Sequence, residues 1–214
     1  MVYIFLGVIG LIATYLTFIN TASLTKDLEP SSESKNMKIH NSELIDNNLK
    51  FLILDTIILE LFDGYTWQGQ DINDPNAKGS IFYAYDNPPS RSVASILAVD
   101  VTEDTSEQDI SLMNPEDVDP FDNRLRADVE SGMNLKEWMS SQLNVNQNNK
   151  VLVTAYITTE SEKEWQYIAI RFSKNGRKIV IIGSFDISMK DALASPVFKT
   201  ISNTSFKFNN VNDQ

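Results

Sequence analysis

The sequence predicts an α+β domain in which an antiparallel sheet is covered by helices. Three observations support this fold class. Strand-like runs follow one another in hairpins, two helical patterns occur without alternating regularly with the strands, and no internal repeat is present. The chain has 214 residues, and roughly 160 of them belong to the folded part, which is the usual size of one domain.

A three-strand meander in the second half is the clearest element, and it consists of residues 150–157, 165–172 and 178–185. The last two runs are joined by a segment centred on Asn175-Gly176, which is typical of a tight type I′ hairpin turn. Residues 159–163 predict a longer polar turn between the first two. The meander therefore predicts consecutive antiparallel strands.

Shorter strand-like runs fill the first half of the folded part, at residues 49–54, 57–62, 65–67, 80–85 and 93–101. Turn-forming residues separate them, notably Asp63-Gly64 and residues 86–90. A last short strand is expected at residues 205–208. These runs extend the sheet on the N-terminal side of the meander.

Two helices are expected. The first covers residues 134–143, where Leu135, Trp138, Met139 and Leu143 recur at spacings of three and four. The second begins at Ser195-Pro196, a capping side chain followed by proline at the first helical position. Both apolar stripes are interpreted as core-facing.

Residues 101–130 interrupt this regularity. Eleven acidic residues fall between Asp100 and Glu130, with Pro115 and Pro120 among them and little apolar patterning. The segment is interpreted as a long surface excursion.

The N-terminus predicts a membrane anchor. Val2–Ile19 is apolar throughout, no charge appears before Lys26, and 18 helical residues would span about 27 Å. No basic residue precedes the apolar run and the small-residue cleavage sites near Ala22 are poor, so an anchor is favoured over a cleaved signal peptide, which stays open. The expected organisation is an anchor at 1–23, a flexible polar tether at 24–48, the domain at 49–209 and a polar tail at 210–214.

The tether and the topology leave alternatives. The tether is low in apolar residues, although Ser42-Glu43-Leu44-Ile45 gives some support to a partly helical stalk. Short N-terminal anchors usually export the domain on their C-terminal side, so we expect a single-pass inner-membrane protein with a periplasmic domain. Lys26, Lys35 and Lys38 favour the opposite orientation when only basic residues are counted.

Several chemistries lack their residues. The chain has no cysteine, and its one histidine, His40, lies in the predicted tether, so the domain holds no histidine-dependent triad. No phosphate-binding glycine motif occurs, and no cofactor is expected. The net charge of −11 would repel nucleic-acid phosphates. Binding is therefore favoured over catalysis.

Calcium is the best metal candidate, because Asp117, Asp119 and Asp122 offer hard oxygen ligands close together. The run does not match the EF-hand loop, since Phe121 stands where a ligand is required. An acidic, solvated loop explains the same residues, and the main expectation is that the domain has no metal site.

Aromatic residues on the early strands are candidates for partner binding: Tyr65, Trp67, Tyr83 and Tyr85, with Phe82 between them. If alternation places them together on an open sheet face, they form a natural protein contact. The alternative is that they fill the core.

The order of these pieces resembles the Mog1/PsbP-like fold group, and within it the bacterial DcrB-like proteins. The resemblance rests on four segments, residues 59–67, 133–143, 165–182 and 196–206, which are similar to the group's opening strand and turn, its helix, its late hairpin and its closing helix and strand. It covers roughly residues 49–208 and implies a sandwich of sheet and helices. It also implies a non-enzymatic binding protein, with no ligand motif that can be carried over.

The expected function is accordingly a membrane-anchored, non-enzymatic binding or assembly domain that faces the periplasm and recognises another envelope protein. One alternative is an immunity or chaperone protein associated with a bacterial secretion system. The other is a calcium- or carboxylate-dependent enzyme, against which the missing histidine chemistry counts.

Overall fold

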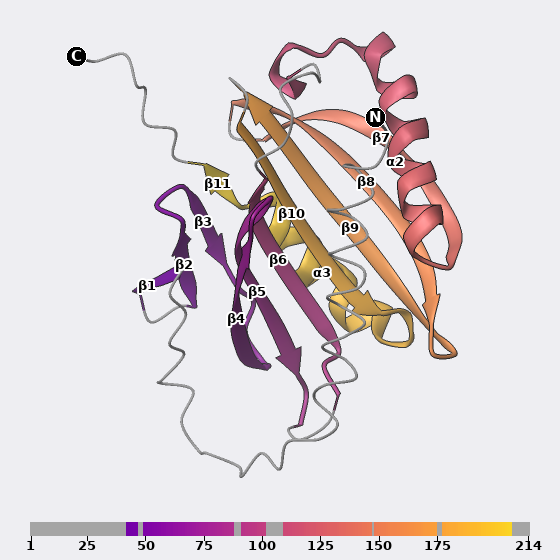
Figure 1. The fold of residues 1–214 in the computed structure, drawn as a ribbon. Coiled ribbons are helices and arrows are strands. Elements are labelled where there is room, and N and C mark those ends of the chain that lie inside the picture. The colour runs from indigo at the N-terminus through magenta and orange to yellow at the C-terminus, as the bar shows by residue number, and fades with distance from the viewer. Residues whose placement is uncertain are drawn as a thin grey trace, which may run out of the picture.

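A computed structural model describes residues 42–46, 49–87, 91–101, 109–146, 148–174 and 177–206. Its strands form two antiparallel sheets, with four strands in the order β1-β2-β3-β11 and seven in the order β4-β5-β6-β10-β9-β8-β7 (Figure 1). The small sheet contains β1 (Ser42–Asp46), β2 (Lys50–Ile53), β3 (Ile57–Glu60) and β11 (Ser205–Phe206). The large sheet contains β4 (Thr66–Asp74), β5 (Ala77–Tyr85), β6 (Ala94–Val101), β7 (Leu135–Asn146), β8 (Asn149–Glu160), β9 (Lys163–Lys174) and β10 (Arg177–Asp186).

The main core lies on one face of the large sheet. There Phe82, Phe172 and Phe185 pack against the inner side chains of the small sheet and against helix α3 (Lys190–Ser202). Figure 1 shows α3 crossing behind β6 and β10, while helix α2 (Val118–Gly132) lies beside β7 and β8. The expected sheet covered by helices is confirmed in this α+β arrangement, and a second sheet shares the covering role.

The meander is confirmed as β8, β9 and β10, which pair consecutively. The turn between β8 and β9 is shorter than expected, because pairing continues to Glu160 and Lys163 and leaves only Ser161 and Glu162 between them. These two residues have φ of 49° and 68°, so both adopt the left-handed conformation of a type I′ turn without glycine. The Asn175-Gly176 turn lies outside the described residues.

The helix expected at residues 134–143 was wrong, because this segment forms the edge strand β7. Its register with β8 shifts between Leu135 and Glu137 and again between Met139 and Gln142. Such bulges insert extra residues into one strand. Leu135, Trp138 and Leu143 consequently face the same side as their partners Thr158, Tyr156 and Leu152, although they are three and five residues apart.

The surface excursion expected at residues 101–130 was wrong in its second half. Asn114 and Asp117 form a capping box, Pro115 opens a short 3-10 turn (Pro115–Asp117), and α2 follows. Phe121, Leu125 and Val129 recur every four residues and are buried. Asp122 obscured this apolar stripe in the sequence, because its buried carboxylate lies on the inward side of the helix.

The second helix begins earlier than expected. A 3-10 turn (Ile187–Met189) leads directly into α3, so Pro196 is the seventh helical residue rather than the first. Proline removes one backbone hydrogen bond inside a helix. Leu193, Val197 and Ile201 are completely buried, and their packing offsets that loss.

The N-terminal limit of the fold also differs from the expected organisation. Residues 42–46 of the expected tether form β1, which pairs with β2 through a bulge. A strand, rather than a helical stalk, occupies Ser42-Glu43-Leu44-Ile45 because β2 offers it a free edge. The expected anchor, His40 and the polar tail lie outside the described residues. Within the described ranges, no helix has the length and hydropathy needed to cross a bilayer.

Candidate binding face of the large sheet

The large sheet has a second face, opposite the main core, which we call the α2 face. Side chains alternate between the two faces of a strand, so register decides which residues share it. One row of paired residues on this face runs through Tyr83, Ser95, Ser184, Tyr167, Tyr156 and Trp138. The next row runs through Ile81, Leu97, Ile182 and Ala169.

The centre of the α2 face is apolar. Ile81, Leu97, Val99 and Ile182 are 1%, 3%, 0% and 8% exposed. Among the described residues of their cluster, only Val129 and Met133, at the C-terminal end of α2, come from outside the sheet. The opposite face, in contrast, is covered by α3 and by the small sheet. Of the described elements outside the sheet, only the C-terminal end of α2 packs on this apolar centre.

A ladder of aromatic rings crosses β7, β8 and β9 on this face. Trp138 stacks on Tyr156 with ring centroids 5.5 Å apart, and Tyr156 stacks on Tyr167 at 5.0 Å. Aromatic pairs contribute about 0.5–1.5 kcal/mol each beyond the area they bury. The ladder therefore fixes the β7 edge as a rigid border of the face.

A buried polar network lies beneath α2. The carboxylate of Asp122 accepts hydrogen bonds from Trp138 Nε1 (3.0 Å) and from the Ser141 backbone N–H (2.7 Å). The hydroxyls of Ser141 and Thr154 are 2.7 Å apart, and Arg171 donates to Thr154 over 3.3 Å. Burial lowers the pKa of Arg171, and Tyr156 and the carboxylates of Asp122 and Asp128 oppose that effect. The network ties α2 to three strands.

Two tyrosines of the ladder, Tyr156 and Tyr167, and the neighbouring Glu160 have shifted pKa values. Burial raises the pKa of Tyr156 to about 12, with Arg171 acting in the opposite direction. Burial also raises the pKa of Tyr167, whose hydroxyl donates to Glu160 over 3.2 Å. The pKa of Glu160 is raised by burial, against the effect of this hydrogen bond. Both tyrosines stay neutral at physiological pH.

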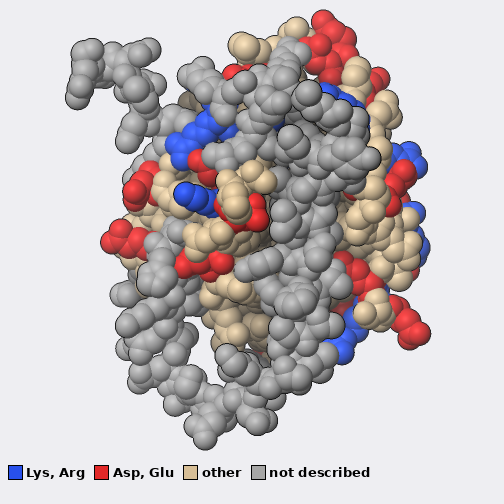
Figure 2. Space-filling model, viewed as in Figure 1, with Lys and Arg blue, Asp and Glu red and all other residues tan. Residues whose placement is uncertain are grey.

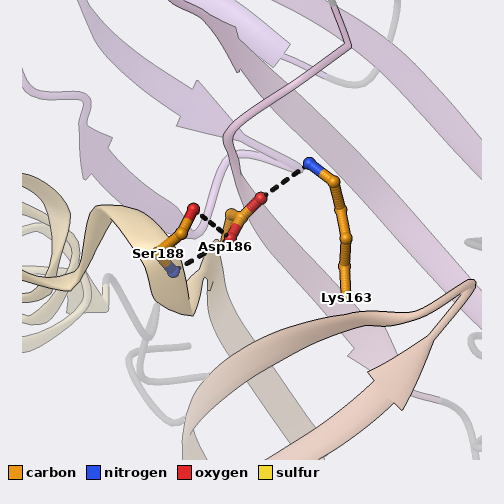
Figure 3. Close-up of polar contacts among 3 residues, drawn as sticks. All are labelled: Lys163, Asp186 and Ser188. Carbon is orange, nitrogen blue, oxygen red and sulfur yellow. Dashed lines mark hydrogen bonds and ion pairs between the residues drawn. The ribbon is translucent and has the colours of Figure 1, made fainter.

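A second polar cluster joins the β8–β9 hairpin to the start of α3 (Figure 3). Asp186 ends β10 and accepts from the Ser188 backbone N–H (3.0 Å), the Ser188 hydroxyl (2.6 Å) and Lys163 Nζ (2.9 Å). Desolvation acts to raise the pKa of Asp186, but these hydrogen bonds outweigh it and lower the pKa. The carboxylate is used as a cap and an anchor for the hairpin, which is a structural role.

The structure separates the four aromatic candidates. Trp67 is 4% exposed in the main core, and its Nε1 donates to the Phe62 carbonyl over 2.9 Å. Tyr65 packs edge-on against Phe62 with centroids 5.5 Å apart. Tyr83 and Tyr85 instead point to the α2 face, where Tyr83 is 9% exposed and Tyr85 is partly buried. The four do not form one contact patch.

The three aspartates of the calcium hypothesis point in different directions. Asp117 accepts from the Asn114 backbone N–H over 2.7 Å, Asp119 is exposed in the first turn of α2, and Asp122 is buried towards Trp138. Among the residues that the structure describes, no group of three or more potential ligand side chains could hold a metal ion.

Charged side chains are mixed over the visible surface. Figure 2 shows lysine and arginine beside aspartate and glutamate around the rim of the described part, with acidic residues gathered at the top, where Figure 1 places the start of α2. Glu116, Asp117 and Asp119 belong to that region. Of the four aromatic candidates for partner binding, only Tyr83 and Tyr85 lie on the α2 face. Leu97, Val99 and Ile182 carry no sequence signal beyond a strand pattern, because register alone decides their side.

Comparisons with known proteins identify the fold. No family model matches the chain, and no curated protein does. The solution structure of cyanobacterial PsbP (CyanoP) from Synechocystis sp. PCC 6803 matches with a TM-score of 0.51 and 14% identity, over 72% of this chain and 88% of that one. LpqN of Mycobacterium tuberculosis, involved in cell envelope biogenesis, gives 0.46 and 14%, over 79% and 88%. A Pseudomonas aeruginosa protein described as a putative regulator gives 0.41 and 9%, over 68% and 88%. The match to CyanoP confirms the expected Mog1/PsbP-like fold, while the likeness to DcrB-like proteins stays a prediction.

Proposed function

We propose that this chain is a membrane-anchored, non-enzymatic binding domain that faces the periplasm and recognises another envelope protein through the α2 face. One observation carries the proposal. The apolar centre formed by Ile81, Leu97, Val99 and Ile182 has described packing partners outside the sheet only at the end of α2.

The polar groups of the domain support binding rather than catalysis. Asp122 and Arg171 are engaged in the network beneath α2, and Asp186 caps the turn before α3. A catalytic acid or base needs to reach a substrate within hydrogen-bond distance. These three side chains are instead bonded to neighbouring parts of the fold.

The experiment places a photoreactive p-benzoylphenylalanine at Tyr85, which borders the α2 face and is partly exposed, in the full chain within its own cell envelope. We expect irradiation to give an adduct with one envelope protein. The matched control carries the same group at Phe198, which is 50% exposed on α3, on the other side of the sheet. Equal adducts from both positions, or none from Tyr85 in a folded protein, would argue against recognition through this face.

Export of the domain is tested separately by protease treatment. In spheroplasts, whose inner membrane is intact, added protease should digest the domain. Protection until the inner membrane is permeabilised would place the domain in the cytoplasm, the orientation that the flanking lysines favour, and would contradict the periplasmic part of the proposal.

A further inference from the structure

The occupant of the α2 face can be argued from the absence of charge at its centre. On β5, β6 and β10 this centre is formed by Tyr83, Ile81, Leu97, Val99, Val180 and Ile182, together with Ser95 and Ser184. None of these central residues carries a charge, and the two serine hydroxyls are 2.8 Å apart and bond to each other. The charged Lys178 lies on the same face only at its end, where it pairs with Val101. Desolvating a charged group on such a surface is costly, so the occupant must be an uncharged apolar segment.

The chain itself contains a segment of this kind outside the described residues. Val2–Ile19 has no charged side chain, and the first charge after it is Lys26. As a helix it would be about 27 Å long and about 10 Å wide. The α2 face extends about 20 Å along β5 from Gly79 to Tyr85, and the four strands from β5 to β9 add about 15 Å of width. The width of this surface therefore takes one apolar helix and not two, and a helix of about 27 Å would extend past its length of about 20 Å.

The connection to the domain allows this segment to reach the face. Residues 20–41 separate it from β1, and 22 residues of flexible chain have a typical end-to-end distance of about 26 Å. Fully extended, the same length reaches about 75 Å. A second copy of the chain is not needed to deliver the segment, and the effective concentration of a tethered segment exceeds that of a free one.

We propose that Val2–Ile19 docks on the α2 face of its own domain whenever it is not inserted in a bilayer. The bilayer and the face then compete for the same segment. A partner reaches the face only after the segment has entered the membrane, so anchoring exposes the binding surface. This inference rests on the proposed function for the identity of the surface, and it adds the way in which that surface is controlled.

The test uses the full chain, purified without detergent, with p-benzoylphenylalanine in place of Tyr85 or, in a second variant, of Trp165, which packs beside the ladder. We expect adducts within one molecule that map to residues 2–19 from both positions, and none from Phe198. Adding phospholipid vesicles should lower the adduct yield about tenfold, as the membrane shifts the two-state equilibrium. Circular dichroism confirms that each variant is folded.

A charge in the segment gives a second measurement. Leu11→Lys should abolish the adduct at Tyr85 without changing the thermal unfolding of the domain's sheet signal, whereas Leu11→Met should preserve it. Adducts between two copies, adducts that map to any other part of the chain, or a yield that vesicles do not change would overturn the proposal. Such a failure leaves the envelope adduct at Tyr85 unaffected, because that adduct is intermolecular and is measured in membranes.

Discussion

Trp67 illustrates how a single side chain decides between a contact surface and a core. Its indole is 4% exposed and packs edge-on against Phe62, with ring centroids 4.9 Å apart. The indole N–H donates to the Phe62 carbonyl, so the one polar atom of the ring is satisfied inside the protein. From the sequence alone, an exposed aromatic patch was an alternative to the core, because alternation along β4 does not say which face is covered.

Replacing Trp67 by alanine should therefore destabilise the domain. Removing a buried tryptophan leaves a cavity and an unpaired carbonyl, and the expected loss is about 3–5 kcal/mol of the free energy of unfolding, measured by urea denaturation. Tyr65→Ala, at a partly buried neighbour, serves as the control and should cost less. Unchanged stability of Trp67→Ala together with loss of the envelope adduct would restore Trp67 as a contact residue.

Glu160 gives a pH dependence with a definite sign. Its pKa in the folded state is raised by burial, so the folded protein binds a proton more tightly than the unfolded chain does. The contribution of Glu160 to stability is fully present below the unfolded pKa, near 4.5, and is lost as the pH rises through the raised folded value.

Glu160→Gln should accordingly raise the melting temperature at pH 7 and make no difference near pH 4. Glutamine keeps an oxygen that can accept the Tyr167 hydroxyl, so the hydrogen bond is retained. Thermal unfolding at several pH values checks this. Glu162→Gln removes the same charge from the exposed turn two residues away and corrects for the general effect of net charge. A lower melting temperature for Glu160→Gln at pH 7 would show that the ionised form stabilises the fold.

At the scale of elements, the sequence predicted strands more reliably than helices. The meander was predicted because three apolar, strand-like runs are separated by turn-forming segments, and β8, β9 and β10 pair consecutively as these turns imply. The helix expected over β7 was wrong because two bulges break the alternation of this strand, and because Met139, whose spacing of four to Leu143 suggested a helix, pairs with Ala155 and lies on the other face. α2 was missed because Asp122, an inward-facing carboxylate, interrupts the apolar stripe, and only the tertiary partners Trp138 and Ser141 make its burial possible.

The candidate face could not be predicted for the same reason. Tyr83 and Tyr85 were identified as aromatic candidates, but their partners on the face come from β6, β9 and β10, which are distant in sequence. Pairing order places β10 between β6 and β9, and no local pattern encodes this order. The composition of the face depends on topology, whereas the strands themselves depend on local period.

Gly183 shows how one strand and one helix are matched in shape. A Cβ atom at this position would lie 2.4 Å from Val197 Cγ1 on α3, a distance that no packed core tolerates. The absence of a side chain therefore lets α3 approach β10 closely. The residue is needed for packing.

Gly183→Ala should lower the free energy of unfolding by about 1–3 kcal/mol, the usual cost of an added methyl group in a packed core. Val197→Ala leaves a small cavity on the facing side and should also destabilise the domain. The double variant should be more stable than the sum of the two losses predicts, because the new methyl group fills the space of the missing ones. Strictly additive losses in urea denaturation would show that the contact between Gly183 and Val197 is not what limits this position.

At the scale of the whole molecule, the two sheets differ in how firmly they are held. The large sheet carries long central strands, and β6, β10 and β9 pair on both edges and contribute fully buried residues to the main core. The small sheet ends in β1, which leaves Leu44 53% and Ile45 46% exposed, and in β11, which has two residues. Short edge strands with few buried contacts open locally without unfolding the rest.

Hydrogen exchange of the full chain should therefore show a graded order. Backbone amides of β6, β9 and β10 should exchange only through global unfolding, while those of β1 and β11 should exchange about a thousandfold faster or more, through local opening. Denaturant below the unfolding midpoint should accelerate the central amides and leave the edge amides nearly unchanged, because local opening exposes little surface. Equal protection of β1 and β6, with equal sensitivity to denaturant, would mean that the small sheet and the large sheet unfold as one cooperative unit. The small sheet and α3 both cover the main-core face of the large sheet. In that case the small sheet would be as stable a cover as α3.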